Sequence, residues 1–191
     1  MPDSDSAHPN PIPSAVLGHA AAGAAMVFAG YVLAFLVQFD WLLGSWSTPF
    51  VLMVVVAVMV MVLLTVRREE DHLRFGRAFG LSVLAGWLAR LGYNAFNLVF
   101  FNLLRPDLKP AYGDLVAEKS MEAFSLFGMD TADFGVGGDM EAMLRERAIE
   151  TLTLGGQALD ALVALVWVAL VALIVSAILQ RPPSISEAKD A

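Results

Sequence analysis

The sequence contains no cysteine and few charged residues. Without cysteine, the chain forms neither disulfide bonds nor thiolate-ligated metal sites. Charged residues make up 16% of the chain and hydrophobic residues 58%, whereas soluble domains average about a quarter charged and just under half apolar residues. The net charge of −7 argues against a nucleic-acid-binding surface, which would have to be basic. The excess of apolar residues indicates a protein buried in a lipid bilayer, which we expect to be its main partner.

Four long apolar segments dominate the chain. Each has roughly the 20 residues that a helix needs to cross about 30 Å of hydrocarbon. Helices are expected because they satisfy their own backbone hydrogen bonds in lipid. The sequence therefore predicts an all-α integral membrane four-helix bundle, with one membrane domain over 15–181 and disordered tails over 1–14 and 182–191. The four predicted spans cover residues 16–39, 49–66, 79–104 and 152–179.

The basic residues predict the orientation of these spans. No lysine or arginine precedes residue 67, and the short loop "RREEDHLRFGR" (67–77) then supplies four arginines. Loops rich in lysine and arginine stay in the cytoplasm. We therefore expect a protein of the bacterial inner membrane with both termini cytoplasmic and the segment 105–150 outside.

The outer segment 105–150 is expected to be helical. Residues 110–128 have the pattern of an amphipathic helix, and a second helix precedes the last span, so the two form a hairpin. The glycine-rich turn "DTADFGVGGD" (130–139) between them lacks the lysine of a phosphate-binding loop. Two interpretations remain open: the hairpin lies on the membrane or caps the bundle, or it docks a partner protein.

The third predicted span carries polar side chains along one face. At about 100° per residue, Arg90, Asn94 and Asn97 point in similar directions, whereas Asn102 points away, near the membrane surface. A charged side chain at mid-membrane costs about 2.5 kcal/mol or more, so this face should turn toward other helices or a wet cavity.

Arg90 requires a partner, and Asp160 is the only acidic residue within the four predicted spans. Counted along ideal helices, however, Arg90 lies ~15 Å and Asp160 ~30 Å from the cytoplasmic end, with Asn97 at ~25 Å. Two possibilities therefore remain. Arg90 pairs directly with Asp160, or Asp160 lies opposite Asn97, whose depth matches better. Gln157 and Tyr93 are candidates to complete the network.

The polar network has two interpretations. It fixes the packing of the helices, or it forms a path for an ion, a proton or a substrate. The three histidines are scattered, and no catalytic triad or H-E-x-x-H motif occurs, so neither an enzyme nor a metal site nor a bound cofactor is expected. The sequence favours a structural or accessory component of a membrane assembly. The alternative is a small transporter or channel subunit with a polar path along spans three and four.

The first predicted span is rich in small residues, which allow helices to approach closely. They favour tight packing within the chain or association with a second copy or another membrane protein. These residues are Gly18, Ala22, Gly23, Ala29, Gly30 and Ala34.

Two stretches of the sequence resemble a known family. They are "FGRAFGLSVLAGWLARLGYNAFNLVFFNLLRPDL" (75–108) and "LVALIVSAILQR" (170–181). In its "F-G-x-A-F" motif at Phe75–Phe79, its "P-D" at Pro106–Asp107 and the end of its last span at Ile174–Arg181, the chain resembles the family called domain of unknown function 4199. The resemblance covers about residues 16–181. It implies four membrane spans and an outer acidic helical segment, but no established activity and no residue roles.

Overall fold

The computed structural model describes residues 13–43, 46–70, 72–126 and 140–180. These residues form helices and contain no β-strand. The helices are α1 (Ser14–Val37), η1 (Phe39–Leu43), α2 (Ser47–Glu69), α3 (Phe75–Val99), η2 (Phe100–Leu104), η3 (Pro106–Leu108), α4 (Lys109–Leu126), α5 (Met140–Thr151) and α6 (Leu154–Leu179).

Several of the predicted boundaries fall differently in the structure: α1 ends at Val37, α2 covers Ser47–Glu69 and α6 begins at Leu154. Ser14, which was assigned to a disordered tail, is the first residue of α1, and α3 begins at Phe75 instead of residue 79. The rest of the predicted tails, apart from Pro13, and the glycine-rich turn at 130–139 lie outside the described residues. The all-α prediction is confirmed for the described residues.

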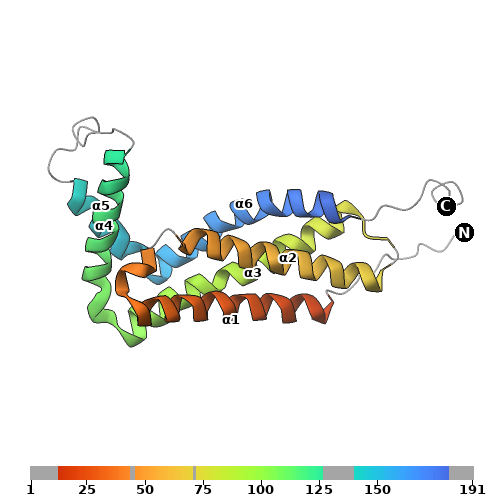
Figure 1. Cartoon of the computed structure of the whole chain (residues 1–191), viewed down its shortest axis with the longest axis horizontal. Helices are drawn as coiled ribbons and strands as arrows, with labels where there is room; N and C mark the ends of the chain where they lie inside the picture. The colour runs from red at the N-terminus through yellow and green to blue at the C-terminus, as the bar shows by residue number, and fades with distance from the viewer. Residues whose placement is uncertain (1–12, 44–45, 71, 127–139, 181–191) are drawn as a thin grey trace, which may run out of the picture.

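The four long helices α1, α2, α3 and α6 run alongside one another, with α3 in the middle (Figure 1). α3 packs against α1, α2 and α6, whereas α1 and α6 lie on opposite sides of it. No residue between Leu81 and Asn94 of α3 is exposed. The core around α3 contains Met59 and Leu63 from α2 and Phe96 from α3 itself, each almost completely buried.

Three of the described helices, α1, α2 and α6, are long and apolar enough to cross a membrane. Their large apolar side chains point outward as well as inward: Leu36 of α1 is 69% exposed and Trp167 of α6 is 67% exposed. Exposing such an apolar surface to water would cost free energy, whereas helices in a bilayer normally present apolar side chains to the lipid. α3 is less apolar than these three helices because it contains charged and amide side chains. Neighbouring helices cover the side of α3 that carries these groups.

The two ends of this arrangement differ (Figure 1). At one end, which we call the basic end, α1 begins and α6 ends. The arginine-rich segment 67–77 also lies there; it covers the end of α2, the connection 70–74 and the start of α3. At the other end, which we call the cap end, α4 runs across the ends of the long helices and α5 leads into α6.

α4 and α5 pack against each other at the cap end. Arg145 Nε lies 2.9 Å from Asp114 Oδ1, and Gly113 leaves room for the side chain of Ile149. The helical content predicted for residues 105–150 is therefore present in α4 and α5, and the connection between these two helices lies outside the described residues.

Candidate functional site

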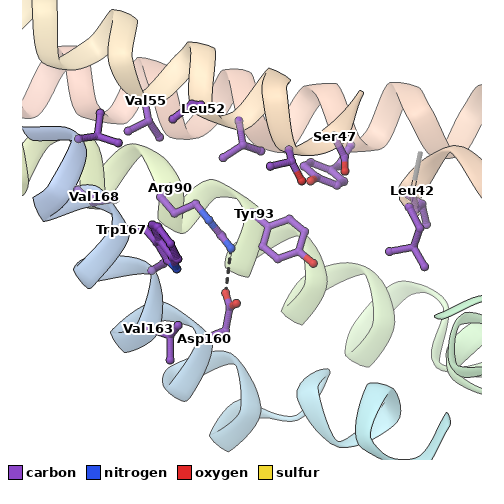
Figure 2. A pocket seen from close by; sticks show the side chains of 16 residues that line it. Leu42, Ser47, Leu52, Val55, Arg90, Tyr93, Asp160, Val163, Trp167 and Val168 are labelled. Carbon is purple, nitrogen blue, oxygen red and sulfur yellow. Dashed lines mark hydrogen bonds and ion pairs between the residues drawn. The ribbon is translucent and has the colours of Figure 1, made fainter. Parts of the chain in front are cut away.

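The start of α6 fixes the position of the acidic residue Asp160. Thr153 caps the helix, because its side-chain oxygen accepts a hydrogen bond of 3.1 Å from the Gly156 backbone N–H. Further along, Trp87 Nε1 of α3 donates a hydrogen bond of 2.9 Å to the Ala161 carbonyl. These contacts set the register of α6 against α3 and turn Asp160 toward Arg90 (Figure 2).

The structure brings Arg90 and Asp160 into direct contact. Arg90 Nη2 lies 3.1 Å from Asp160 Oδ2, and Arg90 Nη1 donates a hydrogen bond of 3.1 Å to Asn94 Oδ1. Asn94 Nδ2 in turn donates to Asp160 Oδ2 at 2.8 Å. The three side chains therefore form a closed ring of charge-assisted hydrogen bonds.

The depth mismatch expected from the sequence is small in the structure. Because α3 begins at Phe75, Arg90 lies about 22 Å along its helix, and Asp160 lies about 28 Å from the end of α6 at Leu179. The arginine side chain extends toward the cap end, which covers the remaining difference (Figure 2).

The other two predicted partners, Gln157 and Tyr93, also join the network. Asn94 Nδ2 donates to Gln157 Oε1 at 2.8 Å, and Gln157 Nε2 donates to the carbonyl of Thr151 at 2.7 Å, which links the network to the end of α5. Arg90 Cζ lies 4.4 Å from the centre of the Tyr93 ring, a cation–π distance. Five of the six residues predicted for the network are thus connected through a series of pairwise contacts.

Asn97, the sixth predicted residue, does not join them. It is 2% exposed, and its Nδ2 has no hydrogen-bond partner among the described residues. The direction of Asn97 around the helix axis correctly predicted that its side chain is buried. The same direction could not show whether a neighbouring helix places a polar group opposite Asn97.

Asn102, which the sequence places away from the polar face of α3, makes two hydrogen bonds of its own at the cap end. Asn102 Nδ2 donates a hydrogen bond of 2.9 Å to the Leu152 carbonyl, and Lys109 Nζ donates one of 2.8 Å to Asn102 Oδ1. Asn102 lies in the π-helical turn η2, where the chain leaves α3, and the segment after it folds back over the cap end. A side chain expected near the membrane surface therefore meets the junction between α5 and α6.

A cavity of about 480 Å³ adjoins the network. It lies between α2, α3 and α6, with η1 at its cap end, and its wall is mostly apolar (Figure 2). Arg90, Tyr93 and Asp160 line it on the side of the network. Residues with hydroxyl groups also line it: Tyr31, Ser47 and Thr48. The Asp160 side chain is 36% exposed and that of Arg90 is 18% exposed, so the carboxylate is the more accessible of the two charged groups.

The network does not continue toward the basic end. Beyond Arg90 in that direction α3 presents Ala89, Gly86 and Ala85, and Met59 packs against Gly86. Beyond the hydrogen bond from Trp87 to the Ala161 carbonyl, the next hydrogen bond between α3 and α6 in that direction joins Ser176 Oγ and Ser82 Oγ at 3.3 Å. The polar groups of the network are therefore confined to the half of the helices nearer the cap end.

Helices that expose apolar surface and turn charged and amide side chains inward define the class of helical membrane proteins. Within this class, the chain belongs to the family described as "Protein of unknown function (DUF4199)", which matches residues 19–181. The family resemblance seen in the sequence motifs is thereby confirmed. Neither a curated protein nor a solved structure matches the chain.

Proposed function

We propose that the protein crosses the inner membrane of a bacterium four times, with both termini in the cytoplasm and the segment 105–150 outside. α3 is the fourth span. It has 25 residues and is thus about 37 Å long, it runs alongside three helices apolar enough to span, and its neighbours cover it. The four arginines of the segment 67–77, at the end of α2 and the start of α3, support a cytoplasmic basic end.

Within this membrane domain, the role that the geometry supports best is structural and non-catalytic: the protein is an accessory component of a membrane assembly. The observation that carries the proposal is that Arg90, Asn94 and Asp160 satisfy one another in a closed ring between α3 and α6. Such a ring holds two helices in one register, because any slip would leave a charge in lipid without a partner.

The outward face of α1 supports a partner in that assembly. The small residues of this helix divide into two faces in the structure. Gly23 packs against α2 and α3, and Gly30 packs against Phe50 of α2. On the other face, Gly18, Ala22 and Ala29 are exposed. A face of small residues allows a helix of a second copy, or of another membrane protein, to approach closely.

The structural role is tested by a double-mutant cycle on thermal unfolding in detergent. We expect Arg90→Leu and Asp160→Leu each to lower the free energy of unfolding by about 2–3 kcal/mol, because each leaves one charge without its partner. The double variant should recover part of this loss. The exposed pair Lys119–Glu122, at 2.9 Å on α4, is the matched control and should show little coupling. Single variants as stable as the parent would overturn the proposal.

The cavity beside the network favours one alternative, a small transporter or channel subunit. Proteoliposomes separate the two functions: the structural role predicts no ion flux above that of empty liposomes. Flux through the wild-type protein that Arg90→Leu abolishes, in a variant that remains folded, would favour transport. The apolar packing around Met59 on the basic side of the network supports the structural role.

A further inference from the structure

We propose that the cavity between α2 and α6 binds an uncharged, single-chain lipid whose hydroxyl group donates a hydrogen bond to Asp160. The proposal rests on the membrane placement proposed above and adds a ligand to the same network. It follows from three properties of the cavity: where it opens, what lines it, and which polar atom it leaves available.

The cavity opens sideways, on the surface that faces lipid. Leu52 of α2 and Val163 and Trp167 of α6 line it, and they are 49%, 53% and 67% exposed. Side chains that line a cavity and are also exposed mark its mouth. A ligand therefore enters from the membrane, between α2 and α6, without crossing the core of the protein (Figure 2).

The wall of the cavity suits a hydrocarbon chain. Val51 and Val55 line it from α2, and Val168 and Val171 line it from α6. Its volume of about 480 Å³ lies in the lower half of the usual range for ligand sites, and sites of this kind combine an apolar wall with a few polar groups. We infer a ligand with one chain, because two chains and a large headgroup would need more space.

The polar side of the cavity determines the headgroup. Among the described residues, the hydrogen bonds to the Asp160 carboxylate all go to Oδ2, from Arg90 and Asn94. In the part of the chain that the structure describes, Oδ1 of the same carboxylate therefore has no donor, and the side chain is 36% exposed. A carboxylate oxygen in an apolar setting requires a donor, and a hydroxyl group supplies one.

The charge of the network selects against ionised headgroups. Arg90 and Asp160 are one cation and one anion, so together they carry no net charge. A phosphate or a quaternary ammonium group beside them would leave one unbalanced charge in a medium of low dielectric constant, which is costly. An uncharged headgroup with a hydroxyl adds a donor without adding a charge.

The ligand is tested with brominated lipids, which quench tryptophan fluorescence at short range, so that Trp167 at the mouth acts as the reporter. The full chain is placed in phosphatidylcholine nanodiscs, and a brominated monoacylglycerol is added at increasing mole fraction. The comparison lipid is the brominated methyl ester of the same fatty acid, which has the chain but no hydroxyl. The quenching due to Trp167 is the part lost in Trp167→Phe.

We expect quenching by the monoacylglycerol to saturate, at about tenfold lower mole fraction than for the methyl ester, because a hydrogen bond to a charged group contributes an affinity of that order. Val163→Phe narrows the mouth and should abolish the saturable part. Leu162→Phe, one residue away, is the matched control: Leu162 is 60% exposed and does not line the cavity, so saturation should persist.

Equal, non-saturating quenching by both lipids, unchanged in Val163→Phe, would overturn the lipid site while leaving the membrane placement intact. Saturation by the methyl ester at the same mole fraction as the monoacylglycerol would overturn the role of the hydroxyl and of Asp160. Failure of both lipids to quench any tryptophan would overturn the membrane placement itself and, with it, the site.

Discussion

Asn94 and Asn97 are the same residue type, three positions apart on α3, and both are buried, yet their environments are opposite. The amide nitrogen of Asn94 donates to Asp160 and to Gln157. The amide nitrogen of Asn97 has no partner among the described residues. A buried polar group without a partner costs about 1–3 kcal/mol, so the two side chains contribute to stability with opposite sign.

Replacing each asparagine with leucine tests this difference, because leucine has a similar size and no polar atoms. We expect Asn97→Leu to raise the free energy of unfolding by about 1 kcal/mol, since it removes a donor that has no acceptor. Asn94→Leu should lower it by about 2 kcal/mol, because it removes the acceptor of Arg90 and donors to Asp160 and Gln157. Thermal unfolding in detergent measures the stability of both variants. A loss of stability in Asn97→Leu would show that the Asn97 amide makes a favourable interaction in the native protein.

Asn102 is a single residue that joins three parts of the cap end. The amide nitrogen of Asn102 in η2 donates to the carbonyl of Leu152, between α5 and α6, and its amide oxygen accepts from Lys109 at the start of α4. Asn102→Ala should therefore increase amide hydrogen exchange at the junction of α5 and α6, while exchange in α1 stays unchanged. The control is Ser125→Ala, since Ser125 is exposed and its hydroxyl donates, among the residues that the structure describes, only to the Glu122 carbonyl of the same helix. Unchanged exchange at Leu152 in the Asn102 variant would show that this contact is dispensable.

At the scale of elements, the close approach of α1 and α3 depends on Gly92. A Cβ atom at this position would meet the backbone carbonyl group of Ala24 on α1. Backbone does not yield as a flexible side chain does, so any larger residue forces the two helices apart. This contact lies within one turn of Arg90 and therefore also affects the position of the network.

Gly92→Ala should lower the free energy of unfolding by about 1–3 kcal/mol, the usual cost of overpacking. Gly80→Ala, on the same helix, is the control, because a Cβ there has no neighbour within 4 Å. It should be neutral or stabilising by up to about 1 kcal/mol, since alanine favours a helix more than glycine does. Unfolding of the two variants in the same detergent gives the comparison, and equal stability would argue against close contact at Gly92.

The helices themselves could be predicted from the sequence because length and apolar content decide whether a segment is helical in lipid. Their ends could not be predicted as well. Ser14 continues the helix beyond the apolar segment, and α3 starts four residues before the predicted position 79, at Phe75. Hydrophobicity marks the part of a helix inside the membrane, whereas backbone hydrogen bonding extends it beyond that part.

The contacts of the network could be predicted in part. A charge among apolar residues requires a partner, and the predicted spans offered Asp160 alone, so the pairing with Arg90 was accessible from the sequence. The roles of Asn102 and Gly92 were not accessible. Both depend on the backbone of a segment distant in sequence, Leu152 for the first and Ala24 for the second, and no periodicity within one helix reveals that backbone.

At the scale of the whole molecule, polar and apolar contacts are unevenly distributed along the long axis. The hydrogen-bonded network and the helices α4 and α5 lie toward the cap end, whereas the core around Met59 and Leu63 is apolar. A ligand bound in the cavity would therefore change the helix packing mainly in the half of the molecule nearer α4. We expect the packing near the basic end to stay rigid.

The absence of cysteine allows the topology to be tested one site at a time. Glu69 ends α2 and Ser125 lies near the end of α4; both are exposed, and α3 lies between them in the sequence. If α3 crosses the membrane, a membrane-impermeant maleimide should label Ser125→Cys in intact cells but Glu69→Cys only after permeabilisation. Leu170→Cys, on the lipid-facing side of α6, should resist labelling in both conditions.

Each result of this labelling bears on a separate part of the topology. Replacing Glu69 removes no lysine or arginine, so the charge bias that sets the orientation is preserved. Labelling of Glu69→Cys alone in intact cells would reverse the orientation but retain the four spans. Labelling of both sites under the same condition would place the two ends of α3 on one side. α3 would then lie within the protein without crossing the bilayer, and the four-span topology would be wrong.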